Sequence, residues 1–312
     1  MTQACDGPQS TLVPAGKSAE QIAELFWWMV AGAILIWFFV VGLSVYAIVV
    51  RPGEHEHRRA TMLIIGGGVI FPTIVLTILL VYGLSLLPPI LEPVPDGSLT
   101  IEVSGEQWWW RVRYLLPDGN EFETANEVRL PVGEPVQFFL ESPDVVHSFW
   151  IPSIGGKVDM IPGRRTRLKL EPTRTGAFRG ACAEYCGTSH GLMNFDVFVE
   201  SPEEYEAWVG QQQRPSTADR SGSTGLRIFL EAGCGACHTI RGTDADGVVG
   251  PDLTHVGSRT SIGAGVLPND EDGFMRWISD TDAIKPGVHM PAFGVMEKSE
   301  RLALAEFLDG LE

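Results

Sequence analysis

Cys182-Ala-Glu-Tyr-Cys186-Gly-Thr-Ser-His190-Gly-Leu-Met193 connects two predicted strands, 176–183 and 194–200. A second stretch, Asp144-Val-Val-His147-Ser-Phe-Trp150, follows another predicted strand, 134–142. Alternating apolar residues, broken by frequent Gly and Pro, predict six short strands between 99 and 200. This pattern predicts an all-β sandwich or small barrel. The loop between its last two strands carries the Cys, His and Met residues quoted first.

The donors in these two stretches favour copper, because thiolate and thioether ligands are soft. Two cysteines four residues apart suffice for two thiolates to bridge two copper ions, each ion also bound by one imidazole, from His147 or His190. Met193 and the backbone carbonyl of Glu184 are the expected weak outer ligands. A Cys182–Cys186 disulfide and a structural zinc site are the alternatives that the residues leave open.

Upstream of this domain lie two long apolar segments. Residues 25–50 and 60–91 are uncharged, and a bilayer core of about 30 Å needs about 20 helical residues, so both predict membrane-spanning helices, at about 25–50 and 60–87. The loop Arg51-Pro-Gly-Glu-His-Glu-His-Arg58-Arg59-Ala60 is rich in arginine and predicts a cytoplasmic turn. The N-terminal segment, 1–24, and everything after Glu92 then lie outside the cytoplasm. Neither segment contains histidine, so a buried oxygen-reducing haem–copper site is expected in a partner chain.

A third region begins after a polar stretch, 210–223, that reads as a linker. Cys234-Gly-Ala-Cys237-His238 is the attachment motif of c-type haem, in which the histidine becomes the proximal iron ligand. Met290 is the expected distal ligand because Pro291 fixes its loop, with Met275 and Met296 as alternatives in predicted helices.

The formal net charge is −16. An acidic surface repels nucleic acid and can attract a basic protein partner, or it can serve solubility alone. Cys5 is either a lipidated N-terminus or an incidental thiol.

The stretch 105–200 resembles subunit II of cytochrome c oxidase, a haem–copper terminal oxidase, through GEQWWWRVRY, DVVHSFWIPSIGGKVDMIPGR and GACAEYCGTSHGLMNFDVFVE. The resemblance implies a cupredoxin-like domain and these copper ligands: His147, Cys182, Glu184, Cys186, His190 and Met193. It also implies that the Glu184 side chain binds magnesium at the interface with subunit I, and that electrons enter through Trp108. Many family members have a glutamate at this position that is associated with proton uptake into subunit I, whereas this chain has Ile65, so the resemblance does not extend to that proton route.

The stretch 224–311 resembles class I cytochrome c, which implies that the Pro251 carbonyl accepts a hydrogen bond from His238. The predicted order is therefore an N-terminal segment (1–24), a transmembrane hairpin (25–91), a cupredoxin-like dinuclear copper domain (92–209), a linker (210–223) and an all-α cytochrome c domain (224–312).

Such a chain is expected in a bacterial plasma membrane, with both metal domains on the periplasmic side. Electrons would pass from an external donor, either cytochrome c or a quinol-oxidising complex, to haem c, then to copper, then to an oxygen-reducing, proton-pumping subunit I accompanied by further subunits. A copper-containing nitric oxide reductase subunit and a copper-binding assembly module are the alternatives. A quinol oxidase subunit is disfavoured because that relative lacks the copper ligands.

Overall fold

The computed structural model describes residues 6–50, 52–53, 56–216 and 223–312. Residues 20–92 form one compact unit, while the N-terminal residues up to Ala19 and residues from Pro93 onwards form the other. Cys5 and Arg51, which carry the lipidation and loop-charge predictions, lie outside the described residues.

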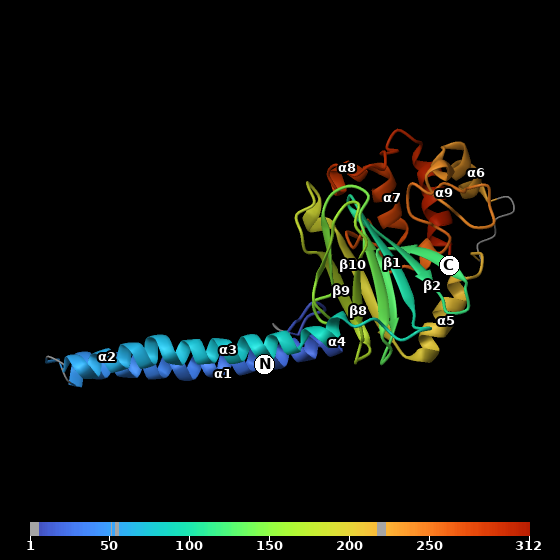
Figure 1. The fold of residues 1–312 in the computed structure, drawn as a ribbon. Helices are drawn as coiled ribbons and strands as arrows, with labels where there is room; N and C mark the ends of the chain where they lie inside the picture. Colours follow the sequence, from blue (N-terminus) through green and yellow to red (C-terminus); the bar gives the residue numbers. More distant parts are fainter. Residues whose placement is uncertain (1–5, 51, 54–55, 217–222) are drawn as a thin grey trace. The chain divides into compact units, whose positions relative to one another are not determined.

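The smaller unit contains two helical segments that run alongside each other (Figure 1). The first consists of α1 (Lys17–Val45) and a π-helical turn, η2 (Tyr46–Val50). The second consists of α2 (His57–Ile65), a π-helical turn η3 (Gly66–Ile70), α3 (Phe71–Ser85) and α4 (Leu87–Leu91). The π-helical turn falls on the three consecutive glycines, and Pro72 follows it in the first turn of α3.

Both helical segments are long and apolar enough to cross a membrane, and their most apolar stretches are unburied within the protein. The first helix begins eight residues before the predicted 25 and the second three before the predicted 60. Charged residues such as Lys17 and Glu20 continue the helix, because the end of an apolar run limits burial in lipid but not helix formation.

Two five-stranded sheets build the β-domain (Figure 1). The first has the order β3-β2-β1-β5-β8, with the strands β1 (Thr100–Glu106), β2 (Trp109–Leu115), β3 (Glu121–Ala125), β5 (Val136–Glu141) and β8 (Thr166–Leu170). The second has the order β4-β10-β9-β6-β7, with the strands β4 (Glu127–Pro131), β6 (His147–Trp150), β7 (Val158–Met160), β9 (Gly176–Cys182) and β10 (Asn194–Glu200). Two pairs, β1–β5 and β10–β4, are parallel, and the others are antiparallel. The predicted sandwich is confirmed, and β3, β4, β6 and β7 add to the six strands that the sequence indicates.

Aromatic rings fill the space beneath the loop between β9 and β10, which carries most of the predicted metal ligands. Phe149 stacks on Phe195 with centroids 4.7 Å apart, and Trp110 meets both rings edge-on at 5.6 and 5.1 Å. All three side chains are fully buried. Since β6 carries both Phe149 and His147, and β10 begins directly after Met193, this cluster fixes the strands that present the loop.

The N-terminal segment belongs to the β-domain. Gly16 forms an isolated bridge with Pro172, the Ala15 amide donates to the Ser153 carbonyl over 2.6 Å, and the Arg179 amide donates to the Pro8 carbonyl over 3.0 Å. A Cβ on Gly16 would lie 2.2 Å from the Ile154 carbonyl oxygen, so only glycine allows this approach. The segment before the helical unit is therefore held on the same structure as the segment after it.

Helix α5 (Pro202–Gln212) includes the first three residues of the predicted linker, 210–212. A capping box between Ser201 and Glu204 starts it, and Trp208 packs edge-on against Tyr114 and Phe122. At the last residue of the helix, the Gln212 carbonyl accepts a hydrogen bond from the Arg241 guanidinium over 2.7 Å, which links α5 to the next domain.

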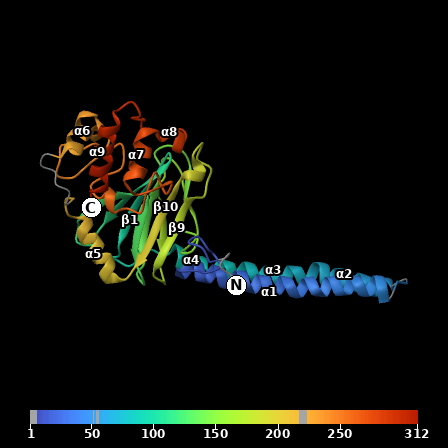
Figure 2. The same ribbon diagram turned by 180° about the vertical axis from the view of Figure 1, so that it is seen from behind.

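The C-terminal domain is helical, as predicted. Its elements are α6 (Thr224–Glu231), the 3₁₀ turns η5 (Cys234–Ala236) and η6 (Val256–Ser258), a small hairpin of β11 (Ser261–Ile262) and β12 (Leu267–Pro268), α7 (Glu271–Ser279), α8 (Thr281–Ile284) and α9 (Lys298–Asp309). Helix α9 packs between α6 and α7 (Figures 1 and 2). A Cβ on Gly225 would lie 2.3 Å from that of Phe307, so the absent side chain lets α6 and α9 cross closely.

Candidate metal centre

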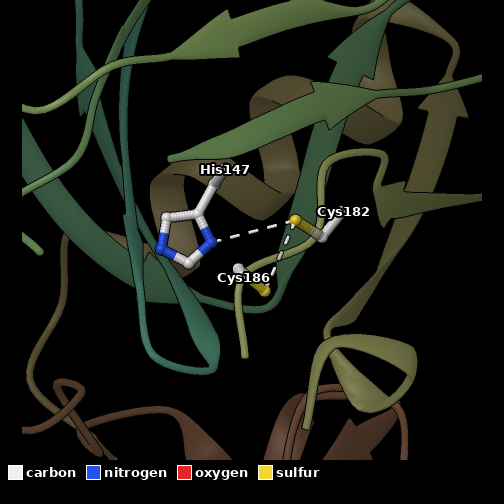
Figure 3. A group of neighbouring side chains, drawn as sticks. All are labelled: His147, Cys182 and Cys186. Carbon is white, nitrogen blue, oxygen red and sulfur yellow. Dashed lines mark hydrogen bonds between the residues drawn. The ribbon is translucent and has the colours of Figure 1, made fainter. Parts of the chain in front are cut away.

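Three chain segments bring the predicted copper ligands together at one end of the β-domain. His147 begins β6, and Cys182 ends the neighbouring β9, where Phe149 is its pairing partner. The loop from β9 to β10 then carries Cys186, His190 in the short 3₁₀ turn η4 (His190–Leu192), and Met193. The strand pairing therefore places His147 above the first cysteine, although 35 residues separate them (Figure 3).

Sulfur lies at the middle of this group. The two cysteine Sγ atoms are 3.8 Å apart, and both thiols are free. The Nδ1 atom of His147 lies 3.8 Å from Cys182 Sγ, and the Nδ1 atom of His190 lies 3.5 Å from Cys186 Sγ. Each thiol thus has one imidazole beside it.

Two further donors complete the set. The Met193 Sδ atom lies 3.8 Å from Cys186 Sγ, and the Glu184 carbonyl oxygen lies 3.1 Å from Cys182 Sγ. Cys182, Cys186 and Met193 are buried. All six predicted ligand residues therefore gather in one place, with the histidine, sulfur and carbonyl donors divided evenly about the two thiols.

The distance between the sulfurs decides between the chemical alternatives. A disulfide needs about 2.05 Å, which 3.8 Å far exceeds. Metal–thiolate bonds of about 2.3 Å span that separation easily, so one ion can bind both sulfurs. A structural zinc ion takes four ligands, whereas five side chains and a carbonyl converge here. The donor set fits two copper ions bridged by the thiolates better than one zinc ion.

Asp144 orients the first imidazole and is the residue that the sequence analysis missed. Its carboxylate lies 2.8 Å from Nε2 of His147, so Nε2 carries the proton and Nδ1 is left to bind a metal. Burial disfavours the Asp144 carboxylate, but the amides of Val145 and Gln107 and the His147 ring outweigh this and lower its pKa. The available signal was an aspartate three residues before a predicted histidine ligand.

Of the Cys182 and Cys186 thiols, one loses its proton much more easily than the other. Their hydrogen bond lowers the pKa of Cys182 to about 3 and raises the pKa of Cys186. Burial works against the protonated His147 ring, but its bonds with Cys182 and Asp144 overcome this and raise its pKa. The centre therefore holds thiolate character before any metal binds, which favours soft metal ions.

The Glu184 carbonyl contacts Cys182, whereas the Glu184 carboxylate contacts Lys157. Its carboxylate lies 3.7 Å from the Lys157 ammonium, and 46% of the side chain is exposed. Magnesium binding by this carboxylate remains a prediction.

Trp108 is attached directly to the metal loop. Its indole Nε1 donates to the Cys186 carbonyl over 2.9 Å, and the residue is only 6% exposed. The predicted electron path from Trp108 to a copper thiolate thus has a hydrogen-bonded contact to build on.

The haem attachment motif lies directly after α6. Cys234 and Cys237 carry free thiols, and Nδ1 of His238 donates to the Pro251 carbonyl over 2.8 Å. This bond leaves Nε2 as the basic nitrogen, as an iron ligand requires. A Cβ on Gly250 would lie 2.5 Å from the ring, so glycine makes room for the imidazole. The motif residues fit a covalently held haem.

The remaining candidate haem contacts are a distal methionine and the Arg259 guanidinium. Met275 and Met296 pack against the core of the C-terminal domain, whereas Met290 is half-buried outside that core cluster. The buried Nε of Arg259 has no hydrogen-bond partner among the described residues, which suits an anionic group such as a porphyrin carboxylate. Of these three methionines, Met290 is thus the one outside the core cluster, and its role as distal ligand stays a prediction.

A β-sandwich with two thiols, two imidazoles and a thioether at one end, followed by a helical domain with a haem attachment motif, defines a metal-dependent electron-transfer protein. Residues 116–201 match the family described as cytochrome C oxidase subunit II, periplasmic domain, and residues 223–312 match cytochrome c. Residues 116–201 thus carry a domain of the cytochrome c oxidase subunit II family, and residues 223–312 carry a cytochrome c domain.

The chain is also similar to individual proteins. The chain is 37% identical over 223 residues to cytochrome c oxidase subunit 2 of Alkalihalophilus pseudofirmus, and 34% identical over 229 residues to that of Bacillus subtilis. Each match covers 70% of this chain and 63% of the relative, so the chain spans less than two thirds of their length. The crystal structure of the periplasmic domain of subunit II of cytochrome oxidase from Bradyrhizobium japonicum is 32% identical, with a TM-score of 0.36, and the match covers 39% of this chain and 97% of that one.

Proposed function

We propose that this chain is the subunit of a respiratory cytochrome c oxidase through which electrons enter the complex. When bound, haem c and copper would act as one-electron carriers between an external donor and an oxygen-reducing, proton-pumping subunit I. The single observation that carries this proposal is the pair of Sγ atoms 3.8 Å apart, each beside one imidazole. The Cys182 and Cys186 thiolates would spread charge over the metal ions that they hold, which would suit electron transfer rather than catalysis.

The chain's own residues supply the ligands and their orientation. His147, Cys182, the Glu184 carbonyl, Cys186, His190 and Met193 would hold copper, while Asp144 fixes the His147 tautomer. Cys234, Cys237, His238 and Met290 would hold haem c, with the Pro251 carbonyl increasing the basicity of His238. The Glu184 carboxylate would reach magnesium at the interface with subunit I.

A membrane location with both metal domains outside is supported by the N-terminal segment. Because residues 8–17 are hydrogen-bonded to the β-domain, both ends of the helical unit lie on the same side of any membrane. The unit must then cross an even number of times, which agrees with two spans and a short cytoplasmic loop. The proposed location is the bacterial plasma membrane, with the metal domains in the periplasm.

Flash photoreduction of haem c in the purified oxidase tests the electron path. Copper should then be reduced at a rate that does not depend on protein concentration, because both carriers lie on one chain. Cys186→Ser should abolish this phase by removing a bridging ligand. Tyr185→Phe, a change at an exposed neighbour in the same loop, should retain it. A copper-reduction rate that rises in proportion to protein concentration refutes the internal path.

A further inference from the structure

The predicted distal ligand Met290 lies in a segment without helix or strand. Residues 285–297 connect α8 to α9, and the neighbours His289 and Pro291 are exposed. Pro291 has no backbone N–H, so it cannot donate a hydrogen bond that would fix this part of the chain. Contacts with other elements must therefore hold Met290 in one position.

Thr281, the first residue of α8, makes such a contact with Met290. Its hydroxyl donates to the Met290 carbonyl over 2.8 Å, and the residue is 1% exposed. The Asp280 carboxylate caps α8 by accepting from the Ala283 amide over 3.2 Å. The Thr281 carbonyl accepts from the Lys285 amide over 2.8 Å, which closes the helical turn. The Thr281 hydroxyl therefore reaches Met290 from a fixed, buried position.

A second attachment follows three residues after Met290. The Phe293 amide donates to the Ile278 carbonyl of α7 over 2.8 Å. A Cβ on Gly294 would lie 2.8 Å from the Ser279 carbonyl oxygen, so glycine lets the segment lie close to the end of α7. The chain is thus fixed to the junction of α7 and α8 both at Met290 and at Phe293.

The Thr281 bond involves the backbone of Met290 and not its sulfur. Met275 and Met296, in contrast, pack against the core of the domain. A neutral thioether is a weak ligand, so its binding to a metal depends on how well the surrounding chain holds it in place. Attachment through the backbone therefore suits a residue whose side chain has another task.

We infer that Thr281 is a positioning residue for haem c, because its hydroxyl fixes the Met290 backbone and so presents the thioether to the iron. The inference rests on the proposed function. A methionine ligand raises the reduction potential of haem iron. Loss of the Thr281 hydroxyl should therefore lower that potential as well as weaken ligation.

The test is Thr281→Val in the full chain with its copper and haem c, because valine keeps the shape of threonine and removes the hydroxyl. The Met290 carbonyl would lose its partner, and the equilibrium for methionine ligation should weaken about tenfold, as expected for the loss of one hydrogen bond. The charge-transfer absorption between methionine sulfur and ferric iron measures ligation, and a redox titration measures the potential. Thr281→Ala also removes the hydroxyl and should show the same losses, which provides a second variant.

Three further variants separate positioning from a general loss of stability. Thr281→Ser keeps the hydroxyl and should retain the absorption and the potential of wild type. Thr243→Val removes a comparable bond in the same domain, from the Thr243 hydroxyl to the Ile240 carbonyl over 2.7 Å, and should also behave as wild type. Met290→Leu should abolish the absorption, because it removes the sulfur itself.

Hydrogen–deuterium exchange measures the attachment without relying on haem. The Phe293 amide is bonded to Ile278, and it should exchange about tenfold faster in Thr281→Val than in wild type, Thr281→Ser or Thr243→Val. Unchanged exchange, or unchanged absorption and potential, in Thr281→Val overturns the inference, as does a sulfur absorption that persists in Met290→Leu. Absence of haem c and copper from the wild-type protein would instead overturn the proposed function, and the exchange result would still decide whether Thr281 holds Met290.

Discussion

Replacing Gly180 by alanine should severely disturb the aromatic cluster beneath the metal loop. A Cβ at this position would lie 1.9 Å from Cζ of the Phe195 ring, whereas ordinary contact begins at 3.4 Å. The ring must therefore move by about 1.5 Å, yet it is fully buried and stacked on Phe149. Overpacking of a core costs about 1–3 kcal/mol, and we expect Gly180→Ala to reach about 3 kcal/mol.

A double substitution isolates the cause. Phe195→Leu removes the ring tip that the new methyl group meets, and on its own it should cost about 1.5 kcal/mol. The double variant should cost about 2 kcal/mol rather than the additive sum, a coupling of about 2.5 kcal/mol between Gly180 and Phe195. Denaturant unfolding of the full chain in detergent, followed by tryptophan fluorescence, measures all three variants. A Gly180→Ala cost below about 0.5 kcal/mol, or additive costs in the double variant, would refute the reasoning.

Three further changes test other parts of the account. Gly250→Ala should displace the His238 ring, since the new Cβ would lie 2.5 Å from it, and lower the haem c content of the purified protein; full haem content would count against this. Ser201→Ala should destabilise the β-domain by about 1 kcal/mol in denaturant unfolding, because it removes the capping box of α5, and an unchanged midpoint would contradict that. Burial lowers the pKa of Lys285 to about 7, against about 10.4 when unfolded, so the unfolded chain binds more protons between these values and stability rises with pH there. Lys285→Met should remove that rise, up to a few kcal/mol between about pH 7 and about pH 10; an equal rise in both proteins would contradict it.

That the candidate metal ligands lie close together was predictable because most of them are close in sequence. Cys182, Cys186, His190 and Met193 share one loop, and their spacing alone restricts the chemistry. The haem motif is equally local. His147 was predictable because an isolated histidine at the end of a predicted strand stood out, and the pairing of β6 with β9 then brings it to the loop.

The polar contacts between residues far apart in the chain could not be predicted from the sequence. The bonds from Asp144 to His147 and from Ser189 to Pro286 depend on how loops approach one another, and no periodicity reports this. Strands β4 and β7 are short or irregular in pattern, and the N-terminal segment gains its order from pairing at Pro172. In each case tertiary contact rather than local preference decides the structure.

The central claim is that two sulfurs hold a pair of copper ions, and the copper content and electron paramagnetic resonance spectrum of the purified protein test it most directly. We predict two copper ions per chain and the hyperfine pattern of one electron shared equally by two copper nuclei. Zinc in place of copper, or the pattern of a single copper nucleus, would contradict the account.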